Sequence, residues 1–341
     1  ETNERDPNSE SETALPVRRL PTAAVVLIVF IIALGLPLFF ILPRVGGAGF
    51  GGSQFGLDTQ SGFSDTVRLG GFGRINQTDE VVMRVKLEGE RSDGSLYFRG
   101  VALDTFDNQA WSRSKTSKAV AEKGDGDLIR IEPAAGSENR TVQTIYLEPL
   151  DTSVLFALPR AVAVQGNFPV LYRDVYGGLS YPRVFERTSY KVFSDRSLPS
   201  VAQLRSDDQP YNTDIKNYVF LPPVYDPRIA KLTETITAAA KNRYDKARAV
   251  ESYLQNNLNY TLEKKAGGSE PLADFLFNVR EGHCEYFATA MAVMLRTQGI
   301  ATRVVNGFHG GDYNDAAGMT IVRQRNAHAW VEVNIPSLRE I

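Results

Sequence analysis

Cysteine is nearly absent from this chain of 341 residues, and its scarcity excludes two kinds of site. Cys284 is the only cysteine, so no disulfide can form within the chain. One cysteine and three scattered histidines offer no zinc-binding spacing, and the sequence contains no phosphate loop or dinucleotide fingerprint. We therefore expect neither a metal ion nor a cofactor, and the lone cysteine requires another explanation.

A surplus of basic residues is absent as well. Lysine and arginine together number 38, against 40 aspartates and glutamates, which gives a net charge of -2. Domains that bind nucleic acid usually carry a clear basic excess, so we expect no nucleic-acid partner. The 43% hydrophobic and 23% charged residues are typical of a globular protein, and the length predicts about two domains.

Charge is missing altogether from one long run near the start of the chain, between Pro21 and Leu42. At about 1.5 Å per residue this run would cross a hydrocarbon layer of about 30 Å, so residues 21–43 are predicted to form a transmembrane helix in a lipid bilayer. Arg18 and Arg19 precede the run and only Arg44 follows it closely. The positive-inside rule then places the tail or loop at 1–20 in the cytoplasm and the rest of the chain outside.

The chain starts with Glu1 rather than methionine, so we expect it to be a piece of a longer protein. Glycine and serine crowd residues 44–74, which predicts a flexible stalk. At 75–195 the pattern changes, because apolar and polar residues alternate from Val81 to Glu88 as in a half-buried strand. Further strands are predicted at 96–103, 128–131, 142–147, 154–158, 161–164, 171–176 and 189–193. Residues 75–195 are therefore predicted to form a β-rich module like a sandwich or barrel, without a catalytic constellation and without a named partner.

Helical patterns dominate the first part of the last segment, residues 196–341. Helices are predicted from Pro227, with Asp226 as the cap, then at 242–257, at 271–278 and from Cys284 to Gly299. Strands follow at 301–308, 319–323 and 326–335. Helices followed by strands predict an α+β core in which helices pack on an antiparallel sheet.

Cys284 lies between His283 and Glu285 at the predicted start of a helix with an apolar face. At a helix start the free N–H groups and the macrodipole favour an anion, so we predict a lowered thiol pKa and an oxyanion donor in the Cys284 N–H. A buried structural cysteine is the alternative. Such a cysteine would more often lie inside an apolar helix, so the sequence favours a functional thiol.

Among the three histidines, His328 is the best partner for this thiol. His283 is adjacent to Cys284 in sequence, and adjacent side chains at a helix start point apart, while His309 lies beside a glycine turn. His328 opens the strand at 326–335, where a fold could bring it to the helix start as a Cys–His pair. Without Cys284, a half-buried sheet histidine would be the preferred interpretation.

Seven segments of the sequence are typical of a known family: GHCEYFA at 282–288, LRTQGIATRVVNGF at 295–308, NAHAWVEV at 326–333, LPP at 221–223, LNYT at 258–261, GFSD at 62–65 and LYFRG at 96–100. Together they resemble the transglutaminase-like superfamily, and in particular its membrane-anchored bacterial TgpA-like branch. The resemblance covers nearly the whole chain after residue 20. It implies a papain-like transglutaminase core at 196–341, outside the cytoplasm at the inner membrane of a bacterium. It also implies that Cys284 is the nucleophile and His328 the general base and acid.

The activity implied by this resemblance is acyl transfer at an amide of a protein or peptide substrate. The thiolate would form a thioester, which an acceptor amine or water would resolve. A cysteine peptidase or amidase acting on cell-envelope peptides is one alternative, and a non-catalytic envelope scaffold is another. The sequence does not separate them.

The third catalytic residue of the family is an aspartate on the strand after the histidine strand. This sequence has no aspartate after Asp315, so the resemblance places that residue beyond Ile341 and the core is expected to be incomplete at its C-terminus. Glu332 lies four residues along the strand from His328. It would be about 13 Å from His328, too far for its carboxylate to accept a hydrogen bond from the His328 ring. Asp312 and Asp315 lie in a glycine-rich loop. We expect no carboxylate on the far nitrogen of His328 within this chain.

Overall fold

The structure, a computed structural model, describes most of the chain between residues 22 and 337. The described residues are 22–41, 63, 66–70, 78–89, 96–123, 127–131, 139–150, 152–182, 186–263 and 265–337. The predicted tail at 1–20 lies outside them, as does most of the predicted stalk at 44–74. The chain forms two compact units, residues 1–56 and residues 57–341.

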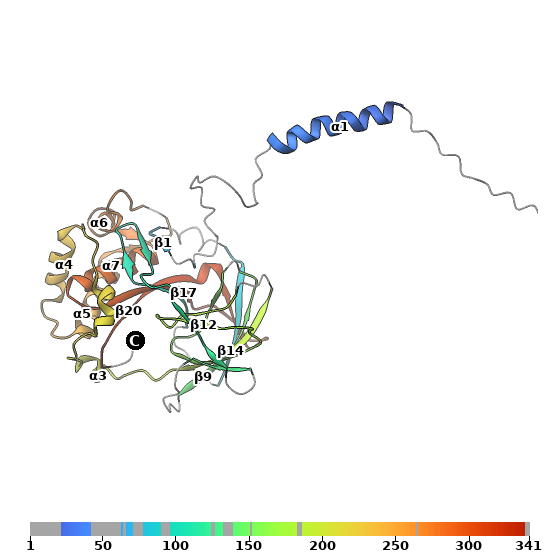
Figure 1. Cartoon of the computed structure of the whole chain (residues 1–341). Helices are drawn as coiled ribbons and strands as arrows, with labels where there is room; N and C mark the ends of the chain where they lie inside the picture. Colours follow the sequence, from blue (N-terminus) through green and yellow to red (C-terminus); the bar gives the residue numbers. More distant parts are fainter. Residues whose placement is uncertain are drawn as a thin grey trace, which may run out of the picture. The chain divides into compact units, whose positions relative to one another are not determined.

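The first unit contains helix α1 (Thr22–Ile41), drawn in blue in Figure 1. In the described part of the chain, no helix combines the length and the apolar character that crossing a membrane requires. The transmembrane helix predicted at 21–43 is therefore not supported by the structure.

An eight-stranded antiparallel sheet forms much of the second unit, in the order β18-β19-β2-β9-β14-β11-β8-β7. Its strands are β2 (Val81–Glu88), β7 (Glu122–Lys123), β8 (Leu128–Arg130), β9 (Arg140–Leu147), β11 (Ala161–Gln165), β14 (Thr188–Asp195), β18 (Asp312–Asn314) and β19 (Met319–Arg323). Along β14 the buried residues Tyr190 and Val192 alternate with more exposed neighbours, as the two-residue period of a strand requires. One face of this sheet therefore joins the core, which confirms the β-rich module.

Two smaller antiparallel sheets belong to the same unit. One has the order β1-β5-β4 and the other β10-β13-β12-β6. The strands are β1 (Thr66–Arg68), β4 (Thr105–Phe106), β5 (Ala110–Ser112), β6 (Lys118–Val120), β10 (Val154–Leu155), β12 (Tyr172–Asp174) and β13 (Leu179–Ser180). The stalk prediction differs from the structure here, because β1 pairs with β5 and Phe63 is buried against the core.

The helices of the second unit gather on one side of it, as Figure 1 shows for α4, α5, α6 and α7. They are α3 (Val201–Arg205), α4 (Pro227–Thr237), α5 (Arg243–Asn257), α6 (Pro271–Asp274) and α7 (Cys284–Thr297), with the short turns η1 (Thr213–Val219), η2 (Phe275–Val279) and η3 (Gln324–Asn326). Asp226 caps α4 and Pro227 occupies its first position, as predicted. Gly299, with φ +69°, follows α7 and lets the chain turn away from the helix.

A three-stranded antiparallel sheet lies against α7, in the order β20 (Ala327–Val333), β17 (Thr302–His309), β3 (Tyr97–Leu103). Ala327 and Ala329 of β20 share the main apolar cluster with buried α7 residues such as Ala288 and Met294. The small alanine side chains let the helix approach the sheet closely. The predicted α+β arrangement of helices on an antiparallel sheet is therefore confirmed.

The predicted modules at 75–195 and 196–341 share strands. β3, from the first, pairs with β17, from the second, over Tyr97 to Leu103. In the opposite direction β19 joins the eight-stranded sheet by pairing with β2. Each module therefore completes a sheet of the other, and the sheet that carries His328 includes a strand that lies about two hundred positions earlier in the sequence.

Candidate active site

Cys284 is the first residue of α7 and has only 2% of its surface exposed. The N–H groups of Glu285 and Ala329 and the hydroxyl of Tyr260 lie within hydrogen-bonding reach of its thiol. Ala329 follows His328 on β20, so the start of α7 lies beside the strand that carries this histidine. The fold therefore brings Cys284 next to the backbone of the strand that carries His328.

The predicted lowering of the thiol pKa is wrong for the protein in this state. Burial raises the pKa of the Cys284 thiol to about 12, and the negative charge of Glu285 adds to the effect. The N–H groups of Ala329 and Glu285 and the Tyr260 hydroxyl lower the pKa of the thiol, but their effect is smaller than that of burial. Loss of solvation outweighs the helix start because a thiolate enclosed by apolar side chains loses its contact with water.

His328 is half-buried on β20, and its ring lies 5.2 Å, between centroids, from the ring of His309. Burial, and to a smaller extent the charge of the neighbouring His309, lower the pKa of His328 to about 4. His309 stacks in turn on Tyr97 at 4.2 Å, and burial lowers the pKa of His309 too. At neutral pH both rings are therefore uncharged, and His328 has a lone pair with which to accept a proton.

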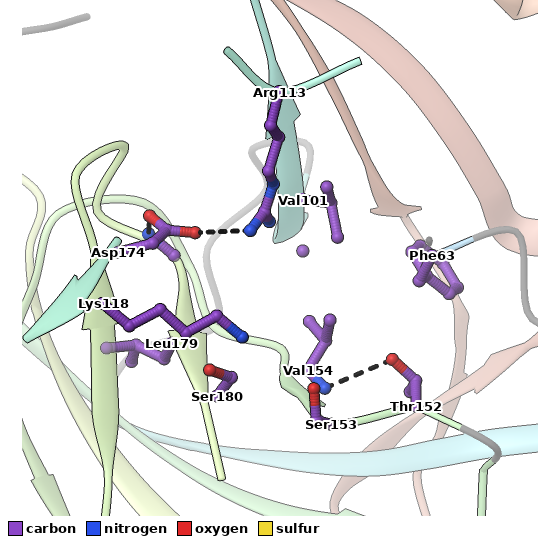
Figure 2. Close-up of a pocket in the computed structure, with 12 residues that line it drawn as sticks. Phe63, Val101, Arg113, Lys118, Thr152, Ser153, Val154, Asp174, Leu179 and Ser180 are labelled. Carbon is purple, nitrogen blue, oxygen red and sulfur yellow. Dashed lines mark hydrogen bonds and ion pairs between the residues drawn. The ribbon is translucent and has the colours of Figure 1, made fainter. Parts of the chain in front are cut away.

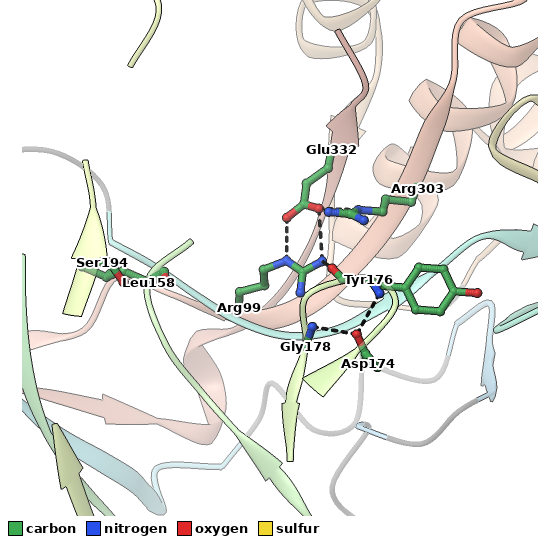
Figure 3. A network of polar contacts seen from close by, with 8 residues as sticks. All are labelled: Arg99, Leu158, Asp174, Tyr176, Gly178, Ser194, Arg303 and Glu332. Carbon is green, nitrogen blue, oxygen red and sulfur yellow. Dashed lines mark hydrogen bonds and ion pairs between the residues drawn. The ribbon is translucent and has the colours of Figure 1, made fainter. Parts of the chain in front are cut away.

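Glu332, on the same strand as His328, is held by two arginines (Figure 3). Arg99 Nε donates to Glu332 Oε1 at 2.9 Å, and Arg303 Nε donates to Oε2 at 2.5 Å. Burial opposes the charged form, but Arg303 and Arg99 together hold the pKa of Glu332 at about 2. The carboxylate is thus committed to a buried ion cluster with Arg99 and Arg303.

The other carboxylates considered for His328 are paired with arginines or exposed. Asp312 accepts from Arg325 at 2.6 Å and from Arg323 at 3.4 Å, and Asp315 is exposed at the glycine turn. Within the described residues, the His328 ring makes no hydrogen bond to a carboxylate. The identity of a third catalytic residue stays a prediction.

His283 is fully buried, and its ring contacts Glu285 rather than the Cys284 thiol. Its Nε2 lies 3.0 Å from Glu285 Oε2, which also accepts from the N–H of Gly70 at 2.8 Å. The ring therefore points to the carboxylate and not to the thiol, as expected of a residue adjacent to Cys284. This contact between His283 and Glu285, which ties the residues around β1 to the helix start, could not be predicted from the sequence.

Tyr260 is a site residue that sequence reasoning did not select. It lies on β15 (Asn259–Tyr260), which pairs in parallel with β16 (Glu281–Gly282), a strand that ends two residues before Cys284. Its hydroxyl lies close to both the backbone N–H and the thiol of Cys284, while 56% of the surface of the residue remains exposed. Its place in the LNYT segment was the signal that could have identified it.

Residues of the β-rich module hold α7 in place. Trp111 Nε1 donates to Thr289 Oγ1 at 2.9 Å, and the ring of Trp111 lies under the Arg296 guanidinium at 5.0 Å. Arg296, 2% exposed, donates to the carbonyl oxygens of Asp104 and Thr302 at 2.7 and 2.6 Å. These contacts satisfy the buried guanidinium, so the helix that carries Cys284 depends on the β-rich module for its position.

Comparison with known proteins agrees with this architecture. The model of the TgpA N-terminal domain matches residues 2–200, more than half of the chain, and the model of the transglutaminase-like superfamily matches residues 230–339. The chain belongs to the TgpA family of transglutaminase-like proteins. Cys284 and His328 both lie within the segment that matches the transglutaminase-like model.

Individual members of this family show the same similarity. The chain is 30% identical, over 299 residues, to a protein-glutamine gamma-glutamyltransferase of Pseudomonas aeruginosa, and 26% identical over 267 residues to the uncharacterized protein YebA of Bacillus subtilis. These alignments cover 87% and 70% of this chain but 42% and 35% of the two relatives, so the chain spans less than half of their length. The crystal structure of the periplasmic domain of TgpA from Pseudomonas aeruginosa aligns with a TM-score of 0.68 and 26% identity, over 82% of this chain and 92% of that domain.

Proposed function

We propose that this chain is the catalytic part of a transglutaminase-like enzyme that transfers an acyl group from an amide through a thioester on Cys284. The observation that carries the proposal is the meeting of α7 and β20, where the thiol contacts the N–H of Ala329, the residue next to His328. A nucleophile at a helix start beside a strand histidine is the arrangement that acyl transfer by cysteine requires.

The raised thiol pKa and the lowered imidazole pKa determine the starting protonation state. With values of about 12 and about 4, the free protein at neutral pH holds a neutral thiol and a neutral imidazole rather than an ion pair. His328 then removes the thiol proton as the sulfur attacks the amide carbonyl, and gives that proton to the departing amine. The proton therefore moves during the attack, as in general base catalysis.

The oxyanion of the tetrahedral intermediate needs a donor close to the attacked carbon. The Cys284 N–H, at the start of α7, is in that position, and in the free protein the Tyr260 hydroxyl lies beside it. In the proposed reaction the substrate oxygen replaces the tyrosine oxygen at this N–H. The exposed position of Tyr260 gives its ring room to move when this happens.

The proposed acyl donor is the side-chain amide of a glutamine in a protein or peptide, and the acceptor is a primary amine or water. The first is supported by the relative from Pseudomonas aeruginosa, which carries the name protein-glutamine gamma-glutamyltransferase. The choice between amine and water depends on access to the thioester, so the same site supports both transamidation and hydrolysis.

A labelled amine tests the proposal and separates these outcomes. The protein is incubated with a glutamine peptide and a labelled primary amine, with Cys284→Ala and His328→Gln as inactive controls. Label on the peptide shows transamidation, and conversion of glutamine to glutamate with release of ammonia shows hydrolysis. Equal product from the wild type and Cys284→Ala would refute the proposal, and no product from either would favour a binding scaffold.

The proposed location of residues 57–341 is outside the cytoplasm of a bacterium. It is supported by the similarity to a periplasmic domain, which aligns over 82% of this chain. Protease added to intact spheroplasts should digest this unit while a cytoplasmic marker protein survives. Protection of the unit until the cells are lysed would contradict the location.

A further inference from the structure

The β-rich module contains a polar cavity of about 270 Å³ that the proposed reaction does not use (Figure 2). Its walls come from β3, β6, β10, β12 and β13 together with Phe63 and Arg113. One wall, at Gly100 and Val101, belongs to the outer strand of the sheet that carries His328 on its opposite edge. Val101 is in register with Asn306, and Asn306 is in register with Ala329, which lies beside the Cys284 thiol. Two strand spacings, about 10 Å in total, therefore separate the cavity wall from Ala329.

The charges that line this cavity do not cancel. Arg113 pairs with Asp174 at 3.2 Å, and both side chains are nearly inaccessible, at 6% and 5%. The other Asp174 oxygen accepts from the N–H groups of Tyr176 and Gly178, at 2.9 and 2.7 Å, so this carboxylate is fully occupied. Lys118, an exposed residue at the start of β6, is the remaining charge among the lining residues, and within the described residues its ammonium makes no hydrogen bond or ion pair with the protein.

Hydroxyl groups complete a set of hydrogen-bond donors around Lys118. Figure 2 shows its amine directed into the space beside Ser153 and Ser180. Thr152 Oγ1 accepts from the N–H of Val154 at 3.2 Å, which leaves its own hydroxyl hydrogen to donate. One uncompensated ammonium with several hydroxyl donors matches a carboxylate, which accepts several hydrogen bonds and carries a single negative charge.

The rest of the lining indicates what the carboxylate is attached to. Phe63, Val101, Val154 and Leu179 add apolar surface, so the ligand needs a short apolar part. A volume of about 270 Å³ holds roughly nine water molecules at about 30 Å³ each, which corresponds to a ligand of about as many non-hydrogen atoms. The C-terminal residue of a peptide with a small side chain has this size.

We propose that this cavity is a binding site for a small carboxylate with a short apolar group, such as the C-terminal residue of a peptide. Lys118 and the hydroxyls of Ser153 and Ser180 bind the carboxylate, and the buried Arg113–Asp174 pair holds the wall on which β6 and β12 meet. Gly178 is required in this wall, because a Cβ there would lie 2.5 Å from Asp174 Oδ2. The site is separate from Cys284 and does not depend on acyl transfer.

The probes are N-acetylalanine and its neutral methylamide, titrated by calorimetry into the Cys284→Ala form of the whole chain so that no reaction interferes. We expect saturable binding of N-acetylalanine and none of the methylamide. Lys118→Met should weaken binding at least about tenfold, because a charge-assisted hydrogen bond is lost. Lys115→Met is the matched control, since this exposed lysine lies three positions away and outside the cavity lining, and it should leave the affinity unchanged.

Equal binding of the methylamide, equal effects of the two lysine variants, or no saturable binding would each overturn the proposal. N-acetyl-alanyl-alanine distinguishes the two sources of such a carboxylate. Binding as tight as that of N-acetylalanine indicates a peptide end, and weaker binding indicates a single acylated amino acid. Because the titration contains no amide-transfer step, failure here leaves the proposed activity of Cys284 untouched, and the reverse also holds.

Discussion

Replacing Glu332 with glutamine tests whether this residue holds the sheet together or assists His328. Glu332 bridges Arg99 and Arg303, whose side chains are 9% and 5% exposed, and its own side chain is 13% exposed. Glutamine keeps the size of the side chain but removes its charge. Two nearly buried guanidinium groups would then lose their counter-charge, which is among the costly changes in a protein interior.

The magnitude follows from the pKa of Glu332. The two arginines hold it at about 2, against an ordinary value of 4.5, and each tenfold change in proton affinity corresponds to about 1.4 kcal/mol. The charged form therefore contributes about 3 kcal/mol to the free energy of unfolding. This contribution is complete above pH 4.5, where Glu332 is charged in both states, and is lost as the pH falls toward about 2.

Urea unfolding of the wild type and Glu332→Gln at pH 7 and at lower pH measures this contribution. We expect a loss of about 3 kcal/mol at pH 7 and a smaller difference between the two proteins below pH 4.5. Glu148→Gln is the matched control, because Glu148 also bridges two arginines, Arg84 and Arg187, but these are 39% and 68% exposed. It should cost less than about 1 kcal/mol.

Activity provides the second readout of this variant. Folded Glu332→Gln should keep the pH dependence and most of the rate of the wild type, because its carboxylate does not contact the His328 ring. Equal unfolding free energies for Glu332→Gln and Glu148→Gln would refute the reasoning about burial. An intact fold with an abolished rate would instead make Glu332 part of the catalytic group.

Three further predictions follow from the site and the sheet beneath it. Iodoacetamide should alkylate Cys284 slowly, because burial raises the pKa of its thiol, and the alkylation rate should rise only above about pH 8.5, the pKa of a free thiol. A pH profile of the alkylation rate with its midpoint below about 8.5 would contradict the buried, neutral thiol. The rate of the proposed acyl transfer should rise with pH through about 4 as His328 loses its proton, and the midpoint should move upward in His309→Gln, where the neighbouring charge is absent. An unchanged midpoint would show that burial alone sets the pKa of His328. Gly307→Ala should prevent folding of the sheet, because its Cβ would lie 2.1 Å from the Phe98 carbonyl oxygen. Gly310→Ala should cost only the backbone strain at φ +76°, because no atom lies within 4 Å of the added Cβ. Similar circular-dichroism melting curves for the two variants would refute the predicted difference.

The raised thiol pKa changes how the lone cysteine should be understood. The sequence places Cys284 at a helix start, where the backbone favours an anion, and the structure confirms the helix start. The same structure encloses the thiol and puts Glu285 beside it, so the neutral form is favoured in the free protein. For the proposed acyl transfer, binding of the substrate and movement of the Tyr260 hydroxyl away from the Cys284 N–H would have to accompany activation of the thiol.

Local pattern was sufficient to predict several features of this protein. The apolar period after Cys284 predicted α7, the Asp226–Pro227 pair predicted the start of α4, and the alternation at 81–88 predicted β2, because each depends on residues that are neighbours in sequence. The segments around Cys284 and His328 also identified the superfamily, since they surround the two chemically distinctive side chains.

Tertiary structure alone decided how these elements share sheets and how the site is charged. Arg99 meets Glu332 across 233 positions, Trp111 meets Thr289 across 178, and β3 completes the sheet of β17 and β20. No local pattern reports such pairings, because strand order is settled by which apolar faces pack together and which buried charges find partners. The pKa values of Cys284 and His328 depend on the same packing, since they are set mainly by the loss of water around each group.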